Sequence, residues 1–220
     1  MKAPLASRFP ASCASSTRTA TPYRPGIAGR IEAARVRAVL GLARIAPQDA
    51  VLEVGCEAGN LLVRTPPTRR LVGADISPRA LADARALFAA RGREADLVQV
   101  DAEQPLPWAR GTFDVILCSE MLEHVRHPER VATNLAALCT PATRVVVSVP
   151  IEAPKLAIKG VLKRLGLLDR LFPGIEQGQS EWHVHAFSPA MLRALLAEHF
   201  VTVRERSVLL MHHAALLRAR

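Results

Sequence analysis

Residues 50–59 read AVLEVGCEAG, an apolar run that passes without a break into a loop containing two glycines. The β-branched run is typical of a buried strand. Glycines at this point let the backbone approach a ligand closely. We expect a helix to follow, with its N-terminal N–H groups facing an anionic group such as a carboxylate. The stretch therefore predicts a strand, a ligand-binding loop and a helix in succession.

Similar apolar runs alternate with helical patterns along the chain. The spacing of apolar residues predicts helices over 27–45, 78–91, 128–139 and from 188 to 199. The predicted strands are 50–55, 70–76, 95–101, 113–119, 144–150, 200–207 and 208–217. Most are continuous apolar runs, as in a parallel sheet that is covered on both faces. The alternation predicts an α/β, doubly wound, seven-stranded and mostly parallel sheet, in which the last hairpin supplies an antiparallel strand.

The bulk composition fits one globular domain of 220 residues. The four cysteines are scattered, with no CxxC pair, which favours a reducing compartment. No uncharged apolar run is long enough to cross a bilayer. We therefore expect a soluble, cytoplasmic protein.

The net charge of +9 is concentrated near the start of the chain. Residues 1–31 contain five basic residues and no acid, and the rest of the chain carries +4. Their Ser-, Thr- and Pro-rich composition favours disorder. We expect residues 1–26 to form a disordered basic arm, ahead of one domain over 27–220 with a cap insertion at 151–181. A transit peptide and a polyanion-binding arm are the alternatives.

Acidic residues mark the ends of the first three predicted strands. Glu53 lies in the first strand, Asp75 ends the second and Asp101 ends the third. In an open α/β sheet, ligands bind outside the carboxyl ends of the strands. An acid in the position of Asp75 accepts hydrogen bonds from both ribose hydroxyls, and Asp101 is placed to accept one from an adenine amino group. The pattern predicts a nucleoside site, whereas the GxGxxG dinucleotide fingerprint is incomplete and no GxxxxGK[ST] motif occurs.

The chain resembles class I methyltransferases that use S-adenosylmethionine (SAM), of the ubiquinone-biosynthesis and "type 11" group. The matching stretches lie between about residues 50 and 200 and read VLEVGCEAG, LVGADIS, VQVDAEQPLPW, FDVILCSEMLEHV and HVHAFSPAMLRALLAEHF. The resemblance implies a Rossmann-like methyltransferase fold. It also implies that SAM is bound by Glu53, Gly55, Gly59, Asp75, Ile76, Asp101, Ala102 and Ser119, with Cys118 beside the sulfonium.

Glu57 departs from the family pattern. The family usually has glycine here, so the loop reads GxExG instead of GxGxG. If the side chain of Glu57 faces solvent, cofactor binding is unaffected, and substitution by glycine is expected to cost a little stability. If it crowds the carboxylate of the cofactor, binding is weakened. The second possibility keeps open a non-catalytic SAM-binding protein.

Glu120, Glu123 and His124 form an ExxEH set after the fourth predicted strand. On a helix, residues three and four apart share a face. The set resembles the metal motif of ubiquinone-pathway O-methyltransferases and of small-RNA 2′-O-methyltransferases, and a divalent ion there would be completed by His185 or His183. We favour a metal-free site in which His124 is the general base. A structural histidine is the alternative.

The acceptor is the least defined part of the prediction. We expect O-methylation of a small or lipid-like molecule, beneath a cap whose Lys155, Lys159 and Lys163 line one helical face. A basic amphipathic helix of this kind also permits peripheral contact with a membrane. The alternative is an RNA-terminal 2′-O-methyltransferase, which the ExxEH set and the basic charge favour and the lack of an RNA-binding module disfavours.

Overall fold

The computed structural model describes residues 26–151, 164 and 184–220. The predicted basic arm and nearly all of the predicted cap lie outside the described residues, as does His183. The described elements are α1 (Ile27–Ala43), β1 (Ala50–Val54), the 3₁₀ helix η3 (Leu62–Arg64), β2 (Arg70–Asp75), α2 (Pro78–Ala90), β3 (Asp96–Gln99), β4 (Val115–Ser119), α3 (Pro128–Leu138), β5 (Arg144–Pro150), α6 (Pro189–Leu196), β6 (Phe200–Val208) and β7 (His212–Ala219). Within the described residues, no helix is both long and apolar enough to span a membrane.

One seven-stranded sheet organises the molecule, with the strand order β3-β2-β1-β4-β5-β7-β6. The five strands from β1 to β5 pair in parallel, and β7 pairs antiparallel with both β5 and β6. The prediction of a mostly parallel, doubly wound sheet is confirmed. Because β1 to β5 are parallel, their carboxyl ends all meet at one edge.

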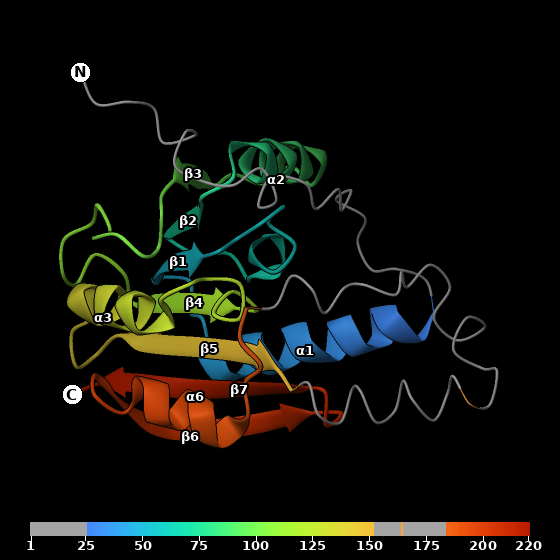
Figure 1. Cartoon of the computed structure of the whole chain (residues 1–220). Coiled ribbons are helices and arrows are strands. Elements are labelled where there is room, and N and C mark those ends of the chain that lie inside the picture. The colour runs from blue at the N-terminus through green and yellow to red at the C-terminus, as the bar shows by residue number, and fades with distance from the viewer. Residues whose placement is uncertain (1–25, 152–163, 165–183) are drawn as a thin grey trace.

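Helices cover both faces of the sheet (Figure 1). On one face, Val39 of α1 and Phe88 of α2 share a buried cluster with Val51 of β1. On the other, Leu135 of α3 and Leu192 of α6 share a second buried cluster with strand residues of the opposite face. Two apolar layers therefore enclose the strands, which explains why the central strands read as continuous apolar runs.

Serine caps fix the starts of two predicted helices. The Ser77 hydroxyl accepts a hydrogen bond from the Ala80 N–H at α2. The Ser188 hydroxyl accepts one from the Met191 N–H at α6. A proline follows each cap, where its fixed φ suits the first helical turn and its missing N–H is not needed.

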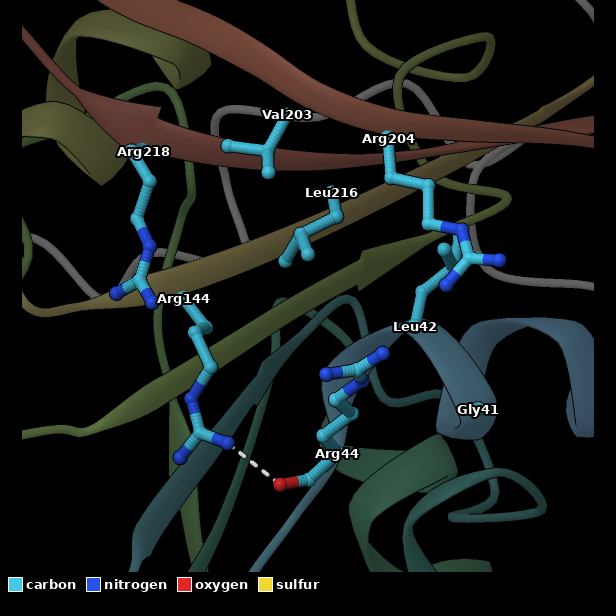
Figure 2. A pocket seen from close by; sticks show the side chains of 8 residues that line it. All are labelled: Gly41, Leu42, Arg44, Arg144, Val203, Arg204, Leu216 and Arg218. Atoms are coloured by element: carbon cyan, nitrogen blue, oxygen red, sulfur yellow. Dashed lines mark hydrogen bonds between the residues drawn. The ribbon is translucent and has the colours of Figure 1, made fainter.

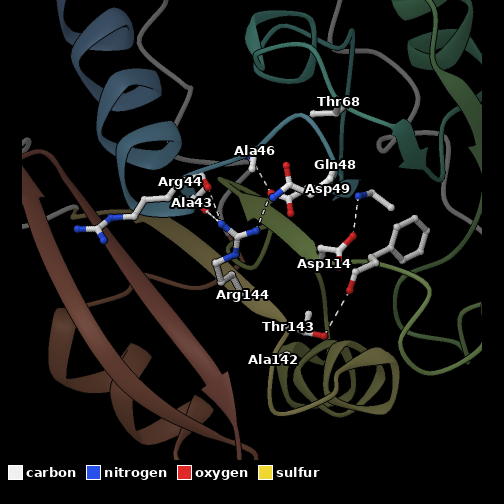
Figure 3. A network of polar contacts seen from close by, with 12 residues as sticks. Ala43, Arg44, Ala46, Gln48, Asp49, Thr68, Asp114, Ala142, Thr143 and Arg144 are labelled. Atoms are coloured by element: carbon white, nitrogen blue, oxygen red, sulfur yellow. Dashed lines mark hydrogen bonds and ion pairs between the residues drawn. The ribbon is translucent and has the colours of Figure 1, made fainter.

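The C-terminal end of α1 is fastened to the sheet by Arg144 (Figure 3). Its guanidinium donates to the carbonyls of Ala43 and Arg44 and forms a 2.6 Å ion pair with Asp49. These carbonyls have no partner within the helix, and a cation is favourable at a helix C-terminus. The amino end of β5 is thus tied both to α1 and to the segment before β1.

Two local predictions are wrong, and one conditional expectation is not met. The helix expected after the glycine loop is only the short η3. The shared face considered for the ExxEH residues required a helix, but residues 120–125 form a turn. The last strand begins at His212 and not at 208, because residues 209–211 form the hairpin loop.

Candidate active site

The loop after β1 is held in a left-handed backbone at three positions. Gly55 and Gly59 each have φ +75°, and Glu57 has φ +48°. A Cβ at Gly55 would overlap the side chain of Met121, while one at Gly59 would lie 3.1 Å from the ring of Phe88 in α2. Both positions need glycine, Gly55 at the carboxyl edge of the sheet and Gly59 for close packing against α2.

Asp75 stabilises this loop from the end of β2. Its two carboxylate oxygens accept hydrogen bonds from the backbone N–H groups of Glu57, at 2.8 Å, and Ser77, at 2.9 Å. Burial raises the pKa of Asp75, and these two N–H donors oppose that rise. Each oxygen keeps acceptor capacity for a further donor. Asp75 can therefore hold the loop and accept hydrogen bonds from a ligand.

The end of β3 lies directly beside Asp75. The Val100 N–H donates to the Asp75 carbonyl at 3.0 Å, which joins the two strand ends. Asp101 accepts from the Glu103 N–H at 2.9 Å, and the carbonyl of Ala102 accepts from Asn134 of α3. The predicted ribose and adenine residues thus share one edge, and turn hydrogen bonds hold the side chain of Asp101.

Glu53 is a buried carboxyl group behind the loop. The residue is 3% exposed, and its Oε2 has no hydrogen-bond partner in the described part of the chain. Burial raises the pKa of Glu53 to about 8, against the opposing charge of Arg35. An unpartnered buried carboxyl oxygen is costly. The position therefore favours a cationic group as its neighbour.

Arg35 is a site residue that the sequence interpretation missed. Its guanidinium donates to the Ser119 hydroxyl and to the carboxylate of Glu32, and the residue is 8% exposed. Ile31, Arg35 and Val39 are spaced four residues apart and lie on one face of α1. An arginine on this otherwise apolar face could have indicated a buried functional residue. Arg35 places a buried positive charge beside the end of β4.

A chain of hydrogen bonds continues from Arg35 across the sheet. The Ser119 hydroxyl lies 2.8 Å from that of Ser148, which donates to Glu120 at 3.2 Å. The other Glu120 oxygen lies 2.9 Å from Nδ1 of His212 in β7. No sequence motif pointed to His212, because its place opposite Pro150 depends on the register of the last hairpin. Cys118, by contrast, packs in the core.

The predicted metal residues lie near one another but face different partners. Glu120 is engaged with Ser148 and His212, and Oε1 of Glu123 lies 3.9 Å from Nε2 of His124. Nε2 of His185 lies 3.4 Å from the carbonyl of Arg126. Among residues 26–151, 164 and 184–220, no three His, Cys, Asp or Glu side chains are grouped to hold a metal ion.

His124 and Glu123 differ strongly in exposure. The His124 side chain is 46% exposed, whereas that of Glu123 is 1% exposed. The Glu123 carbonyl accepts hydrogen bonds from the N–H groups of Val184 and His185, which brings the start of the segment 184–188 to this turn. His124 is therefore accessible to a substrate, while Glu123 supports the turn that carries it.

Known proteins resemble the chain over the same region. Residues 52–145, somewhat less than half of the chain, match a family model described as a methyltransferase domain. A ubiquinone biosynthesis O-methyltransferase of Dechloromonas aromatica is 33% identical over 114 residues, 51% of this chain and 49% of that protein. The chain thus spans about half the length of the curated relatives it matches. The predicted resemblance is confirmed over these residues.

Solved structures extend the likeness to the fold of nearly the whole chain. The magnesium protoporphyrin IX methyltransferase ChlM of Synechocystis PCC 6803, with bound SAH, has a TM-score of 0.62 at 20% identity and covers 87% of this chain and 85% of its own. The [4+2]-cyclase SpnF has a TM-score of 0.67 at 14% identity and covers 93% and 84%. At such identities the likeness concerns the fold alone, and a fold can carry different chemistries.

Proposed function

Because residues 52–145 match the methyltransferase domain family, we propose that this chain is a SAM-dependent methyltransferase. The observation that carries the proposal is the convergence of three features at one sheet edge. They are the positive-φ glycine loop after β1, Asp75 at the end of β2 and Asp101 after β3. Since β1, β2 and β3 are adjacent in the sheet, their ends can serve one nucleoside.

The carboxylates at this edge fit the groups of SAM. Asp75 would accept hydrogen bonds from the ribose, and Asp101 with Ile76 and Ala102 would border the adenine. The unpartnered Oε2 of Glu53 fits the cationic amino group, because a nearby positive charge offsets the cost of a buried carboxylate. Bound SAM supplies a methyl group already activated by its sulfonium, so the residues of the chain need mainly to align the acceptor.

The proposed catalytic residue is His124. An acceptor hydroxyl becomes a better nucleophile as its proton leaves, and the exposed imidazole is placed to take that proton. The Glu123 carboxylate, 3.9 Å from Nε2 of His124, would then stabilise the resulting imidazolium. Ser119, bound to Arg35, would line the same edge of the site. These roles need no metal.

A divalent metal at Glu120, Glu123, His124 and His185 is the less favoured alternative. Both oxygens of Glu120 already engage Ser148 and His212. The turn would have to rearrange before these side chains could share one ion. The metal-free site is therefore the favoured one, and chelation distinguishes the two.

The proposed acceptor is an oxygen of a small or lipid-like molecule, handled in the cytoplasm, with peripheral membrane contact allowed. The name of the relative, a ubiquinone biosynthesis O-methyltransferase, supports an oxygen acceptor. The RNA-terminal 2′-O-methyltransferase is the second candidate, and it rests on the ExxEH residues. The third candidate is a non-catalytic SAM-binding protein, which rests on Glu57 in the glycine loop.

Transfer of label from methyl-labelled SAM tests these candidates together. The chain is incubated with an alkyl-substituted catechol or with a short RNA that has free 3′ hydroxyls. We expect label on the catechol oxygen and none on the RNA. Label on the RNA alone would establish the second candidate. SAM binding without transfer to either acceptor class would favour the third, and failure to bind SAM would overturn the proposal.

Chelation and a His124→Ala variant separate the two active-site chemistries. We expect EDTA to leave the transfer rate unchanged, and the variant to lose about 10²-fold in rate with SAM affinity retained, as for a lost general base. A His127→Ala variant is the matched control, since His127 is an exposed histidine three positions away. Loss of activity in EDTA that Mg²⁺, Mn²⁺ or Zn²⁺ restores would instead establish the metal site.

A further inference from the structure

An arginine-lined hollow lies at the opposite edge of the sheet from the proposed active site. It has a volume of about 260 Å³ and is bordered by Arg44, Arg144, Arg204 and Arg218 (Figure 2). Arg144 is the first residue of β5, so the hollow sits at the amino end of that strand. The carboxyl ends that gather Asp75 and Asp101 are at the other edge. The two sites are therefore spatially distinct.

A β-bulge in β6 brings an arginine into this hollow. The register shifts between Thr202 and Arg204, with Val203 as the extra residue. A bulge puts two residues of one strand against one of its partner and redirects a side chain. As a result Val203 and Arg204 both border the hollow, where strict alternation would send one of them to the other face.

Two of the four arginines around the hollow keep a positive charge that is uncompensated among the described residues. In the described ranges, neither Arg44 nor Arg204 forms an ion pair. Asp49 forms an ion pair with Arg144. Glu205 follows Arg204 in sequence but pairs with Arg193 of α6, on the other face of the sheet. Two guanidinium groups with unused donors thus point at solvent beside two that are held in place.

The held arginines give the hollow a fixed shape. Arg144 is anchored by the carbonyls at the end of α1 and by Asp49, and Arg218 donates to the carbonyl of Ala142. The apolar side chains of Leu42, Val203 and Leu216 also line the hollow. Apolar walls lower the local dielectric and strengthen attraction between the guanidinium groups and an anion.

We propose that this hollow binds a small phosphate-bearing anion. The fork of a guanidinium matches a phosphate bidentately, and the two forks of Arg44 and Arg204 that are unengaged in the described chain, beside the held cations of Arg144 and Arg218, favour a multivalent anion. The volume is just below the range of ordinary small-molecule sites, about 300–1,000 Å³. A diphosphate group therefore suits it better than a large ligand. The proposal stands independently of the methyltransferase activity.

Calorimetry measures the affinity of the chain for inorganic diphosphate and, in a second arm, for ADP. All samples are held at one ionic strength with NaCl. The test variant is Arg44→Gln/Arg204→Gln, which removes two charges whose side chains form no ion pair in the described ranges. The control is Arg91→Gln, an exposed arginine at the C-terminal end of α2 that does not border the hollow. We expect diphosphate binding that weakens at least tenfold in the double variant and stays unchanged in the control.

The two arms identify the source of the phosphate. Equal affinity for ADP and diphosphate assigns the site to the phosphate end of a nucleotide-like molecule, and preference for diphosphate assigns it to a free anion. SAM affinity and melting temperature should match those of the parent in both variants, which shows that folding is intact. No binding by the parent, or equal weakening by Arg91→Gln, would overturn the proposal.

Discussion

Glu53 carries a large cost of burying an ionised carboxylate. Its carboxyl group is buried behind the glycine loop, and burial raises its pKa to about 8 from an ordinary value of 4.5. The folded protein therefore holds this proton over a pH range in which the unfolded chain has released it. Stability contributed by the neutral form is fully present below the ordinary pKa and is lost as the pH rises through the folded value.

Glu53→Gln should remove this pH dependence. An amide does not titrate, so we expect the unfolding free energy of the variant, relative to the parent, to rise by about 2–4 kcal/mol between pH 5 and pH 9. Denaturant unfolding at a series of pH values measures the slope. The exposed Glu94→Gln should keep the slope of the parent. Parallel curves for Glu53→Gln and the parent would contradict the raised pKa.

Glu57 shows how backbone geometry reverses an expectation from the sequence. An added glycine ordinarily costs a little stability. The φ of +48° changes the sign, because a side chain with a Cβ is strained in the left-handed region. The exposed side chain agrees with the interpretation that it faces solvent.

Glu57→Gly should therefore stabilise the fold, by about 0.5–1 kcal/mol. Thermal unfolding against Glu57→Ala measures this, because both variants remove the same carboxylate and only one removes the Cβ. We expect SAM affinity to change little. A glycine variant no more stable than the alanine variant would show that the positive φ carries no strain.

At the level of elements, Arg144 couples α1, β5 and the segment before β1. The Asp49 side chain in this ion pair is 7% exposed and that of Arg144 is 19% exposed. Removing one partner of a buried pair leaves an uncompensated charge, at a cost of about 3–5 kcal/mol. The network therefore holds α1 in the position from which Arg35 reaches Ser119.

Arg144→Met should destabilise the protein by about 3–5 kcal/mol in denaturant unfolding. Adding Asp49→Asn should recover part of the loss, because the unpaired charge is then gone. By comparison, Arg193→Met removes a more exposed pair, 49% and 27% exposed, and should cost at most about 1 kcal/mol. Similar losses for Arg144→Met and Arg193→Met would contradict the coupling.

Most elements could be predicted because their signals are local. Apolar runs predicted the strands, and the Ser-Pro pairs predicted the starts of α2 and α6. The segment after β1 was mispredicted as a full helix, and the conformation of the ExxEH residues was left open, because tertiary contacts decide short segments. Glu120, for example, takes a left-handed φ of +54°, which no helix allows.

At the scale of the whole molecule, the gathering of the proposed SAM-binding residues at one edge could be predicted because parallel strands bring their ends together. Glu53, Asp75 and Asp101 needed only the strand order of the fold. His212 and the arginine hollow could not be predicted this way, since both depend on the register of the β6–β7 hairpin and its bulge. Arg35 was readable from the stripe of α1, but only once that stripe was known to be buried.

SAM binding measured by calorimetry on Asp75→Ala tests the central claim most directly, with Asp96→Ala as control at the far end of the neighbouring strand. Because Asp75 also holds the loop through Glu57 and Ser77, the melting temperature of each variant is checked first. Loss of a charge-assisted pair to the ribose costs about 2–3 kcal/mol. We predict SAM binding by the parent and by Asp96→Ala, and a roughly 30- to 150-fold weakening in Asp75→Ala. A folded Asp75→Ala protein that binds SAM like the parent, or a parent that does not bind SAM, would contradict it.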